Sequence, residues 1–129
     1  MKKILLGVLL LQLNGCVLYD AYFAAKYDTN EYGLATKIKT IAETLECGNE
    51  DTIAEDAKDM WIYSIELKNF TQYLPRNEKS HEMASKLTDI TLGLHNKHGK
   101  MSKVYCEEKI KIIVKTTDDI QRTLGGKPR

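Results

Sequence analysis

The fold class is decided by residues 51–75, which read DTIAEDAKDMWIYSIELKNFTQYLP. Within this stretch, mostly apolar side chains recur at alternating steps of four and three, which is the spacing of a helical bundle seam. The residues at this spacing are Ile53, Ala57, Met60, Ser64, Leu67, Thr71 and Leu74. Pro75 lacks a backbone N–H and disfavours helix in the residue before it. We therefore predict a helix that begins near Asn49 or Asp51 and ends before Pro75.

Two further segments with helical spacing flank this one. Before it, residues 28–30 offer capping side chains, and Gly48 can adopt the left-handed conformation that ends a helix. The apolar positions between these signals are Leu34, Ile38, Ile41, Ala42 and Leu45. After it, a third helix is predicted from about Asn77 to Lys97, with Gly99 marking its end. Its seam consists of Met83, Leu87, Ile90 and Leu94.

The last helix is predicted to start near Ser102 and to close at Gly125–Gly126. Its seam consists of Cys106, Ile110, Ile113, Thr117, Ile120 and Leu124. Residues 109–115 are rich in β-branched side chains and alternate in part, so a strand is the competing interpretation there. The long seam favours a helix. Thr117 here and Ser64 in the second helix are polar residues at nominal core positions.

Four such helices with short connections predict an all-α fold, a small up-down four-helix bundle preceded by a short N-terminal helix. The chain has 129 residues, 43% of them hydrophobic and 29% charged, which is typical of one globular domain. Lys and Arg total 19 against 18 Asp and Glu. With the charges so balanced, we expect no nucleic acid among the partners.

The N-terminus carries a positive leader followed by an apolar run. Lys2 and Lys3 precede residues 4–13, whose one polar member is Gln12. Ten helical residues rise about 15 Å, half of the roughly 30 Å that the hydrocarbon core of a bilayer measures. The run is therefore too short for a membrane span and typical of a secretory signal.

The residues that close this run, Leu13-Asn14-Gly15-Cys16, resemble the lipobox of bacterial lipoproteins. The resemblance covers residues 1–16, and Asn14 departs from the Ala, Ser or Thr that is usual at the second position. It implies cleavage between Gly15 and Cys16 and a diacylglyceryl group on the sulfur of Cys16. The new amino group would receive a further fatty acid such as palmitate, and two or more chains hold a protein firmly to a membrane.

Val17 follows the cysteine, in place of the Asp that commonly retains lipoproteins in the inner membrane. The resemblance therefore implies a lipid anchor at the periplasmic face of the outer membrane. The competing interpretation is a plain secretory signal in which Cys16 is incidental.

The two cysteines that remain, Cys47 and Cys106, are an even number in an oxidising compartment. One pairing is then possible, and we expect a Cys47–Cys106 disulfide. The bundle topology agrees independently, because the end of the first helix and the start of the fourth lie at the same pole of an up-down bundle, where such a bond would clip it. Two free thiols or a metal site are the alternatives. The chain has no CxxC, and neither cysteine has a histidine within five positions, so a zinc site is disfavoured.

The segment after the lipobox is dense in aromatic residues, namely Tyr19, Tyr22, Phe23 and Tyr27. These rings could lie at the membrane interface or pack against the folded body as a short helix, and we favour packing. The expected organisation is thus a signal peptide (1–15), a lipidated anchor and aromatic segment (16–28), a helical bundle (29–125) and a loose, basic tail (126–129).

Patterns for metal or cofactor chemistry are weak. Residues 28–33 begin like an EF-hand loop, but Lys39 occupies the twelfth position, where calcium requires a carboxylate. Helix capping explains these residues better. His95 and His98 lie three apart near a helix end, where the helix dipole favours histidine without a metal. We predict no metal site, no cofactor and no catalytic residue, and hence a protein that is not an enzyme.

Two functions from different classes remain. The first is a non-enzymatic protein-binding or structural module of the cell envelope, a class that includes exclusion and lysis accessories encoded by phages and mobile elements. Its partner would be another envelope protein, and Tyr63, Phe70 and Tyr73 are the candidate partner surface. These rings could instead back the N-terminal aromatic segment. The second function is a ligand- or metal-binding bundle with a transport or redox role, in which His81 or His95 would be the inward-facing donor.

Overall fold

The computed structural model describes residues 27–97 and 99–127. These residues form four helices and no strands: α2 (Thr29–Thr44), α3 (Glu50–Gln72), α4 (Glu78–Asn96) and α5 (Lys103–Gly125). The all-α class is confirmed, and residues 109–115 belong to a helix. The expected signal peptide, the cleavage site at Gly15–Cys16 and nearly all of the aromatic segment lie outside the described residues.

Short polar side chains start three of the helices. The Asp28 carboxylate accepts hydrogen bonds from the backbone N–H groups of Asn30 (2.8 Å) and Glu31 (3.2 Å). The side chains of Asn49 and Ser102 cap α3 and α5 in the same way. Each cap satisfies backbone N–H groups that lack a partner within the helix. The capping role expected for residues 28–30 is therefore confirmed.

The end of α2 differs from the prediction. The helix ends with Leu45 in an extended conformation (φ −68°, ψ 129°), and the Leu45 N–H donates to the carbonyl of Ile41. Gly48 does not adopt a positive φ, whereas Gly99 does (φ 75°). An extended residue is enough to redirect the chain toward α3, so no left-handed glycine is needed at this turn.

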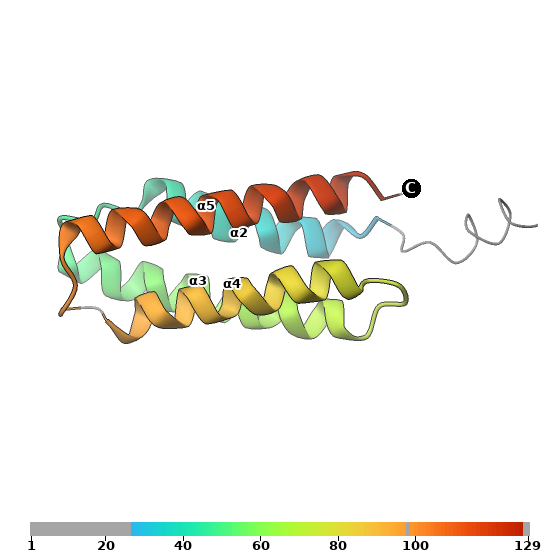
Figure 1. The fold of residues 1–129 in the computed structure, drawn as a ribbon, viewed down its shortest axis with the longest axis horizontal. Coiled ribbons are helices and arrows are strands. Elements are labelled where there is room, and N and C mark those ends of the chain that lie inside the picture. Colours follow the sequence, from blue (N-terminus) through green and yellow to red (C-terminus); the bar gives the residue numbers. More distant parts are fainter. Residues whose placement is uncertain (1–26, 98, 128–129) are drawn as a thin grey trace, which may run out of the picture.

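The four helices pack as a bundle in two layers (Figure 1). α2 and α5 lie side by side over α3 and α4, and α2 also contacts α3 while α4 contacts α5. At one end lie the start of α2, the α3–α4 loop and the end of α5, and we call this end the N-terminal pole. The α2–α3 and α4–α5 connections lie at the other end, which we call the disulfide pole.

The seams predicted for α3 and α5 form much of the core. In α3 the buried side chains are Ile53, Ala57, Met60, Ser64, Leu67 and Thr71, and in α5 they are Cys106, Ile113, Thr117, Ile120 and Leu124. Leu74 and Ile110 are half-buried. Burial of these apolar side chains is the main contribution to the stability of the fold.

The predictions for α2 and α4 are only partly right, because small residues occupy the centre of each buried face. In α4, Met83 and Ile90 are half-buried and flank the core. The buried positions of α4 are Ser80, Ala84, Leu87, Thr88, Thr91 and Leu94. In α2, the predicted Ile38 and Ala42 are buried, but Ala35 is buried in place of Leu34, and Ile41 is only half-buried. Small side chains at the contact let neighbouring helices approach closely.

Buried hydroxyl groups along the α3–α4 contact are satisfied by the backbone. The hydroxyl of Ser64 donates to the carbonyl of Met60 (2.6 Å). The hydroxyl of Thr88 donates to the carbonyl of Ser64 on the neighbouring helix (3.1 Å), and that of Thr91 donates to the Ser64 hydroxyl (3.3 Å). Because each hydroxyl has a partner, its burial carries little of the cost of an unpaired polar group.

A polar cluster on the outside joins α2 to α5. The Lys39 ammonium contacts the carboxylate of Asp118 (3.1 Å) and the amide oxygen of Gln121 (3.3 Å), and Gln121 donates to the hydroxyl of Thr36 (2.9 Å). Hydrogen bonds from Lys39 and Arg122 lower the pKa of Asp118 below its ordinary value. The cluster joins α2 to α5, but because it is partly exposed it contributes little to the free energy of unfolding.

Cys47 and Cys106 form a disulfide at the disulfide pole, with their Cα atoms 5.7 Å apart. Cys47 follows α2 and Cys106 lies in the first turn of α5, so the bond joins two helices at their shared end. The expected pairing is confirmed. Cys106 is fully buried and belongs to the apolar core.

We predict that the Cys47→Ala/Cys106→Ala variant unfolds at lower urea concentration than the parent. The bond closes a loop of 59 residues, so its loss should reduce the free energy of unfolding by about 4 kcal/mol in the chain-entropy treatment. Urea denaturation followed by far-ultraviolet circular dichroism measures this. As a control, a reductant should shift the midpoint of the parent and leave that of the variant unchanged. Equal midpoints for the parent and the variant would contradict the prediction.

Candidate functional site

The N-terminal pole contains a buried ion pair that was not predicted from the sequence. Glu31, in the first turn of α2, is fully buried. One carboxylate oxygen accepts a hydrogen bond from the Asn77 amide (2.8 Å), and the other contacts the ammonium of Lys127 (3.0 Å). Lys127 also donates to the amide oxygen of Asn77. We refer to Glu31, Asn77 and Lys127 as the polar triad.

The polar triad connects three distant parts of the chain. Glu31 belongs to α2, Asn77 precedes α4, and Lys127 follows α5. Asn77 stands at the N-cap of α4 but makes no side-chain capping hydrogen bond, because its amide is engaged with its partners in the triad. The side chain of Lys127, in the segment expected to be a tail, is only 10% exposed. Its ammonium compensates a carboxylate that is buried away from water.

One signal for this triad was present in the sequence. Glu31 precedes Ala35 by four residues, so it lies on the same face of α2 as Ala35, Ile38 and Ala42. A glutamate on an apolar face requires a cationic partner. No local pattern indicates which lysine supplies it, since Lys127 lies 96 residues away.

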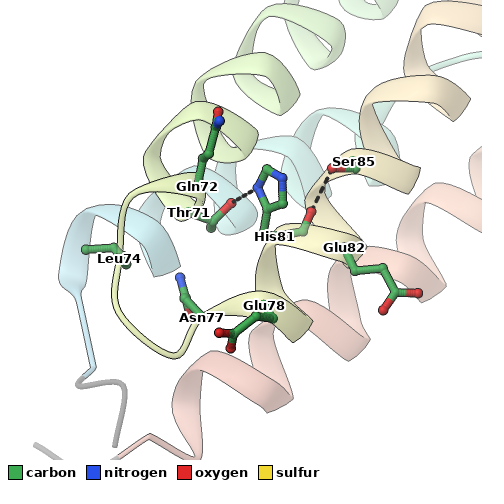
Figure 2. Close-up of a pocket in the computed structure, with 8 residues that line it drawn as sticks. All are labelled: Thr71, Gln72, Leu74, Asn77, Glu78, His81, Glu82 and Ser85. Atoms are coloured by element: carbon green, nitrogen blue, oxygen red, sulfur yellow. Dashed lines mark hydrogen bonds between the residues drawn. The ribbon is translucent and has the colours of Figure 1, made fainter. Parts of the chain in front are cut away.

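Next to the triad, the α3–α4 contact leaves a pocket of about 410 Å³ (Figure 2). Its lining includes Thr71 and Gln72 from α3, together with Glu78, His81 and Ser85 from α4. Figure 2 shows the ring of His81 beside Thr71, with the carboxylate of Glu82 turned away from it.

The imidazole of His81 is held by the backbone of α3. Its Nδ1 lies 3.2 Å from the Lys68 carbonyl oxygen and 3.2 Å from the Thr71 hydroxyl. A carbonyl oxygen can only accept, so the contact with Lys68 assigns the proton of the neutral ring to Nδ1 and leaves Nε2 as an acceptor. His81, one of the two donors considered for a ligand- or metal-binding bundle, therefore joins α3 to α4.

Glu78 and His81 have the Glu-x-x-His spacing of di-iron helical bundles, a feature that was missed at the level of sequence. Such a centre also needs carboxylates from the other helices. Within residues 27–97 and 99–127, His, Cys, Asp and Glu side chains do not form a group of three or more that could hold a metal ion. Glu78 and His81 therefore match one part of a di-iron motif, and the described residues do not supply the remaining ligands.

His95 occupies a different environment. Its ring stacks on Trp61 of α3, with centroids 5.2 Å apart and planes 14° apart. Fourteen residues of α4 separate His95 from His81, which corresponds to about 21 Å along the helix. The two candidate donors therefore do not share one site, and His98 lies outside the described residues.

The three aromatic residues of the candidate partner surface occupy different environments. Tyr63 is half-buried and lies under the ammonium of Lys37, 5.2 Å from the ring centroid. Phe70 is half-buried seven residues later, and therefore on the same side of α3. Tyr73, the C-cap of α3, is 82% exposed at the N-terminal pole. Tyr63 and Phe70 therefore share one side of the bundle, whereas Tyr73 is a separate exposed ring at the N-terminal pole.

Tyr63 also borders a shallow cleft of about 340 Å³ between α2 and α3. Its other lining residues are Thr36, Lys37, Thr40 and Ile41. The lining thus combines an aliphatic side chain and an aromatic ring with two threonine hydroxyl groups and one ammonium. An aromatic residue beside aliphatic and polar groups is the usual composition of a protein-binding patch.

Among the described residues, no helix has both the length and the apolar character needed to cross a membrane. A comparison with protein-family models found no match, and comparisons with curated proteins and with solved structures found none either. A functional assignment for this chain therefore depends on its own residues and their geometry.

We predict that Lys127→Met lowers the free energy of unfolding by about 3 kcal/mol, because it leaves the buried Glu31 carboxylate without a cation. Urea denaturation at neutral pH measures the loss. Lys86→Met is the matched control. Its partner Glu82 is 67% exposed, so the expected change is below about 1 kcal/mol.

The Glu31→Leu/Lys127→Met variant provides a second control, since it removes both charges. It should recover much of the stability lost in the single variant. A Lys127→Met variant as stable as the Lys86→Met variant would show that the polar triad does not stabilise the fold.

Proposed function

We propose that the protein is a lipid-anchored module at the periplasmic face of the outer membrane, which binds another envelope protein and catalyses no reaction. The observation that carries this proposal is the signal of residues 1–16, which resembles a lipoprotein signal and would leave Cys16 as the acylated N-terminus. Val17 after the cysteine supports the outer membrane. Exclusion and lysis accessories of phages and mobile elements belong to this class.

The disulfide supports an extracytoplasmic location. It joins the two cysteines other than Cys16, and such bonds persist in oxidising compartments. Cys16 is thereby the one cysteine that remains for acylation. For the fold itself, we propose an up-down-up-down order preceded by a short N-terminal helix, supported by the short connections between successive helices.

The contact surface for the partner would be the side of the bundle that carries Tyr63 and Phe70, with the α2–α3 cleft at its centre. Tyr63, Lys37 and Ile41 combine a ring, a cation and an apolar side chain in that cleft. A protein that acts on an envelope protein through this surface needs only a membrane anchor and one binding face.

We predict that Cys16→Ser abolishes labelling of the protein by a fatty-acid analogue and leaves the precursor unprocessed. The thiol is the acceptor of the diacylglyceryl group, and a hydroxyl does not replace it. Metabolic labelling followed by gel electrophoresis measures both effects. The matched control is Cys47→Ser/Cys106→Ser, which should be labelled normally. Normal labelling of the Cys16→Ser variant would refute the anchor.

We predict that a photo-crosslinking amino acid at Tyr63 captures one discrete envelope protein in intact cells. The same probe at Ile112 on α5, which is 43% exposed, is the control and should not capture it. Immunoblotting detects the adduct, and Phe70→Ala should reduce its yield by about tenfold if this side chain is an anchor of the interface. The same adduct from both positions, or none from Tyr63, would refute this contact surface.

A further inference from the structure

The N-terminal pole presents an unusually exposed aromatic side chain. Tyr73 is 82% exposed, the highest value for a large hydrophobic side chain in the described part of the chain. The next highest is Val104 (69%), which lies at the disulfide pole in the first turn of α5. A tyrosine ring has an apolar body and a polar hydroxyl, so the headgroup region of a bilayer suits it better than water does.

The loop that carries Tyr73 is held in place by the polar triad. Tyr73 lies four residues before Asn77, which is only 3% exposed and donates to Glu31. Glu31 in turn lies in the first turn of α2, where the chain emerges from the N-terminal segment. The loop that carries Tyr73 therefore lies at the same end of the bundle as the start of α2, where a membrane tether would join it (Figure 1).

The length of the tether favours this pole as the one nearer the membrane. Tyr27 lies eleven positions after Cys16, and even a fully extended chain of that length reaches at most about 40 Å. The bundle is about 35 Å long, judged from the 23 residues of α3. To place the disulfide pole against the bilayer, the tether would have to run almost straight along the whole bundle.

Charged groups at this pole balance each other. Arg76 and Lys79 are exposed, and so is Glu78, while Asp28 is half-exposed. Arg122, in the last turn of α5, is paired with Asp118, and Lys127 is paired with Glu31. Among the described residues, the charges at this pole therefore give no net attraction to anionic lipid, so contact with a membrane would depend on the aromatic ring and not on charge.

We infer that the N-terminal pole is the surface that rests on the lipid bilayer, with Tyr73 inserted at the level of the headgroups. This inference rests on the proposed lipid anchor. It adds an orientation: the long axis of the bundle stands away from the membrane, and the α2–α3 cleft faces sideways, where it is open to an envelope protein.

Quenching by brominated phosphatidylcholine tests this orientation in the acylated, full-length protein. Tyr73→Trp and Val104→Trp are compared in a Trp61→Phe background, so that each variant has one tryptophan. Both positions are exposed, so neither substitution disturbs the core. We expect emission from position 73 to fall about twofold in brominated vesicles relative to unbrominated ones, and emission from position 104 to stay unchanged. Raising the salt to about 0.5 M should leave the quenching intact.

Three outcomes distinguish the possibilities. Variants that sediment with vesicles and show quenching only at position 73 support the inference. Variants that sediment but are quenched equally, or lose the quenching in salt, overturn the inference and leave the anchor standing. Variants that do not sediment refute the anchor itself, and the inference fails with it. Repeating the pair with Trp61 retained guards against a folding defect of the background, because Trp61 then adds the same signal to both proteins.

Discussion

The architecture depends on how the bundle accommodates one carboxylate that water does not reach. Glu31 is fully buried, and an ion in that position costs several kcal/mol unless its charge and lone pairs are satisfied. Asn77 and Lys127 satisfy them, and in doing so they fix the start of α2, the α3–α4 loop and the segment after α5 relative to one another. The opposite pole is held by a covalent bond between Cys47 and Cys106. The triad thus links all four helices at one pole, and the disulfide joins α2 to α5 at the other.

Between these two constraints, the bundle is packed through small side chains. Thr88 and Thr91 contact Ser64 across the α3–α4 contact, and the hydroxyl groups bond to backbone carbonyls or to each other. Larger residues such as Met83 and Ile90 flank the core and cover it. His81 adds a further link between the same two helices. The polar residues that first suggest a binding site inside the bundle are thus largely explained by the way α3 meets α4.

The sequence was sufficient for the helices, the disulfide and two of the four seams, because these follow from periodicity and from an even number of cysteines. It was less informative for α2 and α4, where hydrophobicity alone favoured Leu34, Ile41, Met83 and Ile90, although close approach of helices selects alanine and threonine. The polar triad could not be predicted, since Asn77 is a typical capping residue and Lys127 follows a pair of glycines. Contacts across 96 residues depend on the assembled fold and leave no local pattern.

The position of Lys127 has a consequence for a nascent chain. Ribosomes synthesise Glu31 long before its cation, so every intermediate shorter than 127 residues has a carboxylate that must either stay hydrated or be buried without compensation. The α3–α4 hairpin can form early, because its contacts are local. The closing of α2 against the rest gains compensation for its buried carboxylate only after Lys127 has been synthesised.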